Sequence, residues 1–346
     1  MSSSEPLSFF GNPSSPYTRK MLSLLRYRRI AHSVIWGSPD AAPKHLPKPK
    51  VGLLPTFYFR MDDGSFEAVV DSTPIARRLE EEYKGRSAIP EDAELAFYMA
   101  LIEDYADEWL TKPMFHYRWH HDADRQHAGR FLSFTSDTSQ DRESAENRAE
   151  AFTKRQFERL YVVGSNDQTA EIIETSYERF LGILDSMLEE RPYLLGNRPS
   201  VADFAVFGQM TQLGLVDPTP RRLMLEKAPR LEAWLWKTDD LSGLELAGCD
   251  WSETGGIRRA LAPLLDEIAQ TYQPVLLANA KAVMNGATQF TADVHGSEWT
   301  QPTFPYQAKC LAELRDRFAS LDKPAKKACA ATMTANNCGA MIEGLT

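Results

Sequence analysis

The order of strand-like and helix-like segments at the start of the chain is the feature that most constrains its fold. Short apolar segments with strand character lie at residues 7–10, 32–36, 55–61 and 66–70. Residues 16–28 have apolar side chains at helical spacing, and Asp71-Ser72-Thr73-Pro74 is typical of the start of a second helix. Asp62-Asp63-Gly64 joins the last two strands and predicts an antiparallel hairpin. The predicted order is therefore βαβ, a loop, and ββα.

This order is typical of a thioredoxin-like domain, which we predict for residues 1–85. After a linker at 85–91 the character changes, because helical periodicity without strand signals dominates as far as residue 246. We therefore predict an all-helical bundle domain over residues 92–250. Its helices are expected at residues 92–121, 142–163, 169–190, 200–215 and 229–238. The polar segment 118–142 is expected to be a mobile connection.

The last region, residues 251–346, is predicted to be a mostly helical extension. Two of its segments, 257–268 and 310–318, each have an apolar face that needs a partner to pack against. A loop rich in Thr, Gly and Pro is expected between them at 288–305. The extension is expected to pack on the helical domain or to reach over the cleft between the domains as a lid. The fold class is accordingly α+β, with two domains and an extension.

Composition and charge restrict the class of protein. With 346 residues, 43% of them hydrophobic and 25% charged, the chain fits a soluble globular protein. A formal net charge of -9 argues against a nucleic-acid partner, whose binding needs a basic patch. Apolar runs stay well short of the roughly 20 residues that cross a bilayer, and the opening MSSSEPLSFF lacks the pattern of a secretion signal. We expect no membrane partner and a cytoplasmic location.

Neither cysteine nor histidine spacing predicts a metal site. The cysteines lie late in the chain without a Cys-x-x-Cys pattern, at positions 249, 310, 329 and 338. His116 and His120 are four residues apart on a predicted helix, with His121 and Asp122 next to them. A zinc site needs a third ligand. We therefore expect a solvated helix end here and no metal.

The turn between the first strand and the first helix carries the first candidate site. Ser14, Ser15 and Tyr17 lie where free backbone N–H groups and the positive end of the helix dipole favour an anion. A thiol bound there is stabilised as its thiolate, and a hydroxyl donor adds to the effect. In the alternative interpretation, Ser14 and Ser15 only cap the helix.

Leu53-Leu54-Pro55 and Asp71-Ser72 are two further candidate segments. By base rate alone the Leu54–Pro55 bond is trans; a cis bond would leave the N–H and C=O of Leu54 free to bind an extended peptide. At the second segment, the start of a helix and the Ser72 hydroxyl favour a carboxylate ligand, while Asp71 suits a ligand ammonium. Taken alone, Asp71-Ser72 predicts only a helix cap.

Together, these three segments resemble, in order and spacing, the glutathione-binding half of the glutathione transferases. The second domain agrees, because residues 193–204, YLLGNRPSVADF, resemble the family's mark at the start of the central helix of its helical domain. There Ser200 and Asp203 predict a capping box for a helix without further charges, which is expected to lie in the core, so that Asp203 is structural. The resemblance covers residues 5–250. The region after Trp251 departs from the family's two-domain pattern.

The resemblance implies how the thiol of glutathione is activated. Ser15 occupies the position at which serine-type members hydrogen-bond the glutathione sulfur. Ser14 and Tyr17 are the alternative donors. Because cysteine-type members have a cysteine there, the serine favours activation of a thiolate over mixed-disulfide chemistry.

The resemblance also implies how the rest of glutathione is held. Leu54, followed by Pro55, would pair its main chain with the cysteinyl part, and Asp71 and Ser72 would hold the γ-glutamyl end. A lysine of the connection at residues 39–50 would meet the glycyl carboxylate. The candidates for this role are Lys44, Lys48 and Lys50.

A hydrophobic electrophile, expected to be aromatic, would bind in the cleft between the domains, beside the first helix of the second domain. That stretch is rich in aromatic side chains, namely Tyr105, Trp109, Phe115, Tyr117 and Trp119. The alternative for each of these rings is packing in the core.

The leading interpretation is a glutathione S-transferase with glutathione as co-substrate. It would form thioethers or cleave an activated aryl ether, in a detoxification role. The resemblance implies a homodimer. The alternative is a non-catalytic scaffold or binding protein of the same fold, suggested by the extension and by the acidic run at residues 91–108. Charge runs of this kind are usually a solvated face.

Overall fold

The first domain is a four-stranded mixed sheet with two helices. The structure, a computed structural model, describes residues 6–37 and 43–344. The strands are β1 (Leu7–Gly11), β2 (His32–Trp36), β3 (Thr56–Arg60) and β4 (Phe66–Val69), and their order in the sheet is β2-β1-β3-β4. β1 pairs in parallel with β2, whereas β3 is antiparallel to both β1 and β4. The helices are α1 (Pro16–Arg28) and α2 (Ser72–Glu82). The thioredoxin-like prediction and the β3–β4 hairpin are confirmed.

Alternating side chains give this sheet two apolar faces. On one face Phe9 and Phe57 stack with their ring centroids 4.7 Å apart and join the core that includes α1 and α2. On the other face Phe10 and Tyr58 pack with Leu46 of the loop before β3. Both faces are therefore covered, which explains why β3 is buried at four successive positions.

The second domain is all helical. Its elements are α3 (Ala93–Glu108), α4 (Thr111–His120), α5 (Asp122–Ser136), α6 (Arg142–Phe157), η2 (Leu160–Val163), α7 (Ala170–Glu190), α8 (Val201–Thr211), the π-turn η3 (Gln212–Val216), α9 (Pro218–Lys227) and α10 (Arg230–Thr238). Helix α8 is buried along its whole length and packs against α1 and α3, so it joins the two domains. Gly208 allows this contact, because a Cβ there would lie 2.4 Å from the Pro16 carbonyl oxygen.

The capping box predicted at Ser200 and Asp203 is confirmed. One Asp203 carboxylate oxygen, Oδ2, accepts the Ser200 N–H and the Ser200 hydroxyl at 2.8 and 2.7 Å. The other, Oδ1, accepts the Leu194 N–H at 2.8 Å. Asp203 is fully buried and therefore holds the incoming chain as well as the start of α8.

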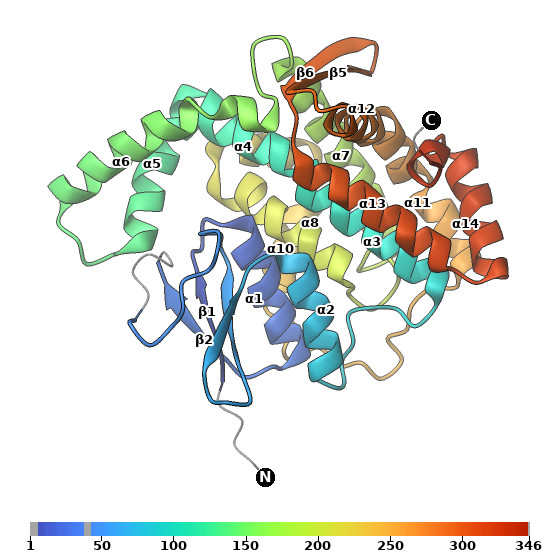
Figure 1. Cartoon of the computed structure of the whole chain (residues 1–346), viewed down its shortest axis with the longest axis horizontal. Coiled ribbons are helices and arrows are strands. Elements are labelled where there is room, and N and C mark those ends of the chain that lie inside the picture. The colour runs from blue at the N-terminus through green and yellow to red at the C-terminus, as the bar shows by residue number, and fades with distance from the viewer. Residues whose placement is uncertain (1–5, 38–42, 345–346) are drawn as a thin grey trace.

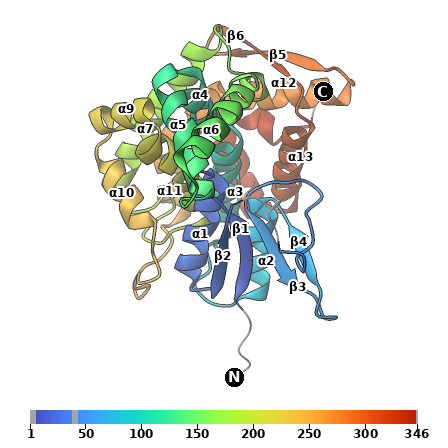
Figure 2. The same cartoon turned by 90° about the vertical axis from the view of Figure 1, so that its left-hand side faces the viewer.

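Besides the short 3-10 turn η4 (Gly339–Met341), the described part of the extension contains four α-helices and a hairpin. These are α11 (Thr254–Gln270), α12 (Tyr272–Met284), β5 (Gln289–Val294), β6 (Ser297–Pro302), α13 (Pro305–Ser320) and α14 (Lys323–Ala335). Helix α13 runs beside α3 (Figure 1). The β5–β6 hairpin lies at the opposite end of the molecule from the four-stranded sheet (Figure 2). The fold class of two domains and a mostly helical extension is confirmed.

Two contacts, an ion pair and a packed indole, help to attach the extension to the helical domain. The Arg258 guanidinium of α11 donates to both carboxylate oxygens of Glu94 on α3, at 2.5 and 2.6 Å. Trp299 of β6 packs over Gly164, where a Cβ would lie 2.3 Å from the indole, and its ring centroid is 5.5 Å from that of Trp109. The extension thus packs on the helical domain, which was one of the two arrangements expected.

Three predictions of secondary structure are wrong. The expected mobile connection at 118–142 contains the end of α4 and all of α5, and the expected loop at 288–305 contains the β5–β6 hairpin. The expected helix 92–121 is two helices, interrupted at Trp109 and Leu110. Tertiary packing accounts for two of these cases: Trp299 gives the hairpin its core contact, and Arg118 at the end of α4 forms a buried ion pair with Asp217. In the described ranges, no helix is long and apolar enough to cross a membrane.

The acidic run on α3 is buried, which contradicts the expectation of a solvated face. Glu94, Glu103, Asp107 and Glu108 are all buried. Tyr272 of α12 donates its hydroxyl to Asp104 at 2.6 Å, and Gln307 of α13 donates its amide to the Glu108 carbonyl oxygen at 3.4 Å. Burial, reinforced by Asp104, raises the pKa of Glu108 to about 8.

Replacing Asp203 should show how much the capping box stabilises the fold. In Asp203→Ala, three buried donors lose their acceptor, and we expect the free energy of unfolding to fall by about 3 kcal/mol. The control is Asp141→Ala, which removes an exposed cap of α6 that accepts only the Ser144 N–H, at a cost of about 1 kcal/mol. Chemical denaturation measures both. Equal losses would contradict the special role of Asp203.

Glu108 should make the stability of the protein depend on pH. The pKa of Glu108 is higher in the folded than in the unfolded chain, so ionisation of its carboxyl destabilises the fold. The free energy of unfolding therefore falls as the pH rises from about 4.3, the pKa in the unfolded chain, through about 8, the pKa in the folded chain. Glu108→Gln should unfold with about the same free energy as wild type near pH 4 and with about 5 kcal/mol more near pH 9, at about 1.4 kcal/mol for each unit of pKa shift.

The variant must be compared with wild type at each pH, because burial also lowers the pKa of the neighbouring Lys112 to about 8. Titration of Lys112 changes stability in the opposite sense to that of Glu108. Glu81→Gln, an exposed substitution on α2, is the control and should leave the pH profile unchanged. A Glu108→Gln profile parallel to that of wild type would contradict the prediction.

Candidate functional site

The turn between β1 and α1 presents one hydroxyl that keeps a proton to donate. Ser15 is the N-cap of α1, and its hydroxyl oxygen accepts the Thr18 N–H at 3.2 Å. The residue is half-buried. Among the hydrogen bonds of the described residues, none takes the proton of the Ser15 hydroxyl. The cap therefore leaves this hydroxyl available as a donor at the positive end of the helix.

The two alternative hydroxyls already donate within the protein. Ser14 is buried, and its hydroxyl donates to the Asn12 side-chain oxygen at 2.5 Å. The Tyr17 hydroxyl donates to the main-chain oxygen of Asp107 at 2.9 Å. Burial, with the nearby carboxylates of Glu108 and Asp107, raises the pKa of Tyr17 well above its usual range. Neither group is as free to meet a ligand as the hydroxyl of Ser15.

Arg118 of α4 holds this turn in place. Its guanidinium donates to the Ser14 carbonyl oxygen at 2.9 Å, to the Asp217 carboxylate at 2.9 and 3.1 Å, and to the Gln212 side-chain oxygen at 2.7 Å. Gln212 in turn donates its amide to the Pro13 carbonyl oxygen at 3.2 Å. Sequence analysis missed Arg118 and Gln212, because no local pattern marks a residue whose partners lie about a hundred positions away.

The Leu54–Pro55 peptide bond is cis, against the base rate. The pairing of β3 with β1 begins at Thr56, whose hydroxyl donates to the Leu53 carbonyl oxygen at 2.6 Å. No hydrogen bond among the described residues occupies the main chain of Leu54. Its N–H and C=O thus stand free just before the start of β3, as the cis alternative predicted.

Asp71 and Ser72 begin helix α2. Asp71 has a φ of 81°, and its Oδ1 accepts the Thr73 N–H at 3.2 Å, while Ser72 is buried. The Asp71 Oδ2 accepts the hydroxyl of Tyr306, from α13, at 2.6 Å. The extension therefore reaches the first domain at this residue. A carboxylate has about four acceptor positions, so the two bonds leave room for a further donor.

A buried ion-pair network joins α1, α2 and α3 beside these residues. The Lys20 ammonium lies 2.8 Å from Glu103 and 2.5 Å from Asp107. The Thr73 hydroxyl donates to the same Glu103 oxygen at 2.9 Å. This network fixes the start of α2 relative to α1. No local pattern marks Lys20, because α1 also carries three arginines, at positions 19, 26 and 28.

The structure does not choose among the three candidate lysines. Lys44, Lys48 and Lys50 are all exposed on the loop before β3. Residues 39–42 of the connection that was predicted to carry them lie outside the described residues.

Most of the candidate aromatic side chains are in the core. Tyr105, Trp109, Tyr117 and Trp119 are at most 1% exposed, whereas Phe115 is half-buried. The Tyr105 ring packs against Tyr272, and the Trp109 ring against Trp299, both from the extension. The extension thus covers part of the surface from which these rings were expected to line a cleft.

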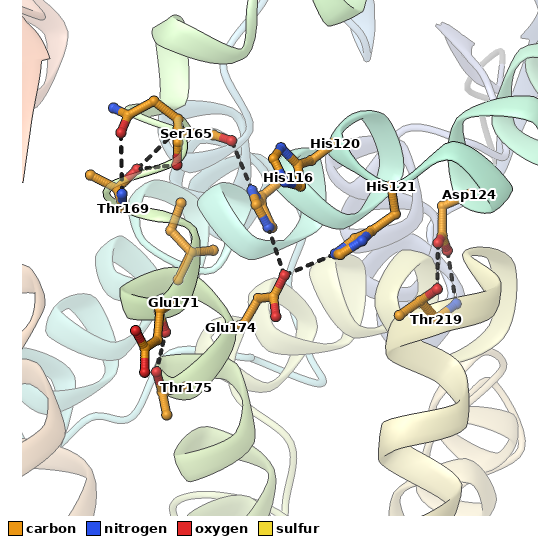
Figure 3. A network of polar contacts seen from close by, with 12 residues as sticks. His116, His120, His121, Asp124, Ser165, Thr169, Glu171, Glu174, Thr175 and Thr219 are labelled. Carbon is orange, nitrogen blue, oxygen red and sulfur yellow. Dashed lines mark hydrogen bonds and ion pairs between the residues drawn. The ribbon is translucent and has the colours of Figure 1, made fainter.

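The expectation of a solvated helix end at His116 is wrong. His116 is fully buried and contacts Ser165 and Glu174 through its two ring nitrogens. Glu174 of α7 also contacts His121, so that two imidazoles converge on one carboxylate (Figure 3). Sequence analysis missed Glu174, which lies more than fifty positions away from both histidines.

Comparisons with known proteins agree with this architecture. Residues 9–87 match the family model described as glutathione S-transferase, N-terminal domain, and residues 156–235 match that described as glutathione S-transferase, C-terminal domain. No curated protein matches the chain.

Among solved structures, the chain is similar to a GST-like protein from Pseudomonas syringae, with 18% identity, a TM-score of 0.41, and coverage of 68% of this chain and 67% of that one. It is also similar to a glutathione transferase family member from Pseudomonas fluorescens with two glutathione bound, with 16% identity, a TM-score of 0.42, and coverage of 68% and 89%.

The two family models fall on the two structural units just described, in the same order. The first covers β1 to α2 and the residues that follow, and the second covers the helical segment that contains α7, α8 and α9. The chain therefore contains the N-terminal and C-terminal domains of the glutathione S-transferase family, at residues 9–87 and 156–235.

Proposed function

We propose that this protein is a glutathione transferase in which Ser15 stabilises the thiolate of bound glutathione. The observation that carries the proposal is the Ser15 hydroxyl, which accepts from Thr18 and keeps its own proton for a ligand. The free main chain of Leu54 and the start of α2 at Asp71 and Ser72 supply the remaining contacts that the family resemblance implies for a tripeptide.

The energy required for this activation is small. Lowering a thiol pKa from about 8.5 to about 6.5 corresponds to about 2.7 kcal/mol in favour of the thiolate. A hydrogen bond to a charged group contributes about 1.5–3 kcal/mol, and a helix N-terminus adds up to about 1 kcal/mol. One serine hydroxyl at the first turn of α1 therefore suffices.

Glutathione would lie across the three segments. The main chain of Leu54, held by cis-Pro55, would pair with the cysteinyl residue as an added strand. The start of α2 at Ser72 would bind the γ-glutamyl carboxylate, and Asp71 would bind the ammonium through its unused acceptor positions. Lys50 is our choice for the glycyl carboxylate, because it is exposed and nearest in sequence to Leu54.

The chemistry that follows is a nucleophilic displacement. The thiol proton leaves to solvent, the thiolate sulfur forms a bond to an electrophilic carbon, and the leaving group departs with the electron pair of the broken bond. With an aryl ether, the departing group is a phenolate that takes up a proton. Of the candidate rings Tyr105, Trp109, Phe115 and Trp119, only Phe115 is accessible enough to contact a hydrophobic electrophile in this arrangement.

One observation favours the second candidate, a non-catalytic binding protein of this family. Tyr306 occupies one oxygen of Asp71, so the extension already uses part of the γ-glutamyl site. The two proposals differ in whether glutathione binds and ionises. The cytoplasmic location remains a prediction from the sequence pattern, and the role in detoxification and the homodimer remain predictions from the family resemblance.

Substitution of Ser15 tests the proposed activation. Because Ser15→Ala removes the donor to sulfur, the pKa of bound glutathione should rise by about one unit or more, with a loss of about tenfold in conjugation rate near neutral pH. Ultraviolet titration of the bound thiolate measures the pKa. Ser14→Ala is the matched control, since its hydroxyl donates to Asn12, and it should change the pKa little. If Ser14→Ala raised the pKa of bound glutathione as much as Ser15→Ala does, the proposed role of Ser15 as the donor to sulfur would be wrong.

Substitution of Asp71 tests the proposed binding of the ammonium. Asp71→Asn removes the negative charge that would face the ammonium of glutathione. A charge-assisted hydrogen bond contributes about 1.5 kcal/mol, so we expect the affinity for glutathione to fall about tenfold. Tyr306→Phe keeps the carboxylate and frees its Oδ2, so it should bind glutathione at least as tightly as wild type. Titration calorimetry measures both. Absence of any glutathione binding by wild type would instead favour the non-catalytic protein.

A further inference from the structure

Three side chains from separate segments converge on one point away from the proposed glutathione site. His116 comes from α4, His121 from the junction of α4 and α5, and Glu174 from α7 (Figure 3). The Nε2 atoms of His116 and His121 lie 3.1 and 2.9 Å from the same Glu174 oxygen, Oε1. The three potential ligand atoms all lie within 4.8 Å of one another.

We propose that His116, His121 and Glu174 bind a divalent transition-metal ion of the zinc class. Two imidazole nitrogens and one carboxylate oxygen form a ligand set that zinc accepts in proteins, with a fourth position left to water. Calcium and magnesium prefer oxygen ligands alone, so the two histidines select against them.

The distances require only a small rearrangement on binding. Zinc lies about 2.1 Å from nitrogen and oxygen ligands, so two ligands of one tetrahedral ion are about 3.4 Å apart. The two imidazole-to-carboxylate separations of 3.1 and 2.9 Å are within about half an ångström of that value. The two imidazoles approach each other by at most about 1.4 Å, which a rotation of the half-exposed His121 ring supplies.

Other residues hold the buried ligand in its orientation. The second ring nitrogen of His116, Nδ1, lies 2.7 Å from the hydroxyl of the buried Ser165. Metal-binding histidines commonly use their second nitrogen in this way. The ring of His120 stacks on that of His116 with a centroid separation of 4.5 Å, which limits rotation of the His116 ring.

The site is accessible and its surroundings favour a cation. The His121 and Glu174 side chains are 33% and 35% exposed, so an ion can enter from solvent although His116 is buried. Besides Glu174, the carboxylates of Asp122 and Asp124 interact electrostatically with His121, and the carboxylate of Asp167 interacts electrostatically with His120. A bound ion would join α4 to α7 two residues before Arg118, which holds the Ser14 carbonyl oxygen.

Zinc titration of the full chain, after dialysis against a chelator, tests the proposal. We expect binding of one zinc ion per chain by calorimetry. With cobalt as probe, we expect visible absorption of the intensity typical of a four-coordinate ion. His121→Ala and Glu174→Gln should each weaken zinc binding about a hundredfold or more, whereas Ser165→Ala should weaken it about 10- to 100-fold by releasing the His116 ring.

The matched control is His127→Ala, which removes an exposed histidine of α5 outside the cluster. It should leave zinc affinity unchanged, and circular dichroism should show that all variants are folded. If Glu174→Gln fails to fold, the more conservative Ser165→Ala still decides the question. The proposal is overturned if wild type binds no zinc stoichiometrically, or if zinc affinity is unchanged in His121→Ala and Ser165→Ala. It is also overturned if His127→Ala lowers zinc affinity as much as they do.

Discussion

The candidate site depends on one buried cation, the guanidinium of Arg118. It joins the Ser14 carbonyl oxygen to the Asp217 carboxylate and the Gln212 side-chain oxygen, so that residue 14, residue 118 and the segment 212–217 meet at one point. Breaking such a buried pair costs about 3–5 kcal/mol, because the remaining charge stays desolvated without a partner. Arg118 therefore fixes the position of the β1–α1 turn relative to the helical domain. In that position the Ser15 hydroxyl accepts the Thr18 N–H and still has its own proton to donate.

The extension is part of the site region as well as of the fold. It covers the acidic side of α3, places Tyr272 and Trp299 against aromatic rings of the helical domain, and reaches Asp71 through Tyr306. Because it fills surface that aromatic candidates were expected to line, the proposed electrophile site would be lined by other residues than the resemblance implies. The same packing explains why the carboxyl of Glu108 is buried and its pKa raised.

Local signals predicted the first domain and the helix starts well. The hairpin at Asp62-Asp63-Gly64, the cap of α2 and the capping box at Ser200 and Asp203 each depend on residues within a few positions of one another. The predictions that are wrong concern segments whose structure depends on contacts with distant residues. The β5–β6 hairpin, which turns at His295 and Gly296 with positive φ at both, lies in a segment that was assigned to a loop, because its main apolar contact, Trp299 on Gly164, is not visible locally.

The sequence by itself determined the order of the elements, the two domains of the family and the positions of Ser15, Leu54 and Asp71, because caps, turns and periodicity are encoded by neighbouring residues. The tertiary structure alone decided which hydroxyl keeps its proton, which acidic residues are buried, and that Glu174 meets His116 and His121. The Tyr17 hydroxyl, the buried carboxylates and the two histidines depend on burial and on partners more than fifty residues away, whereas Ser14 donates to Asn12, two residues away. Desolvation and long-range pairing belong to the packed chain, and no local pattern specifies them.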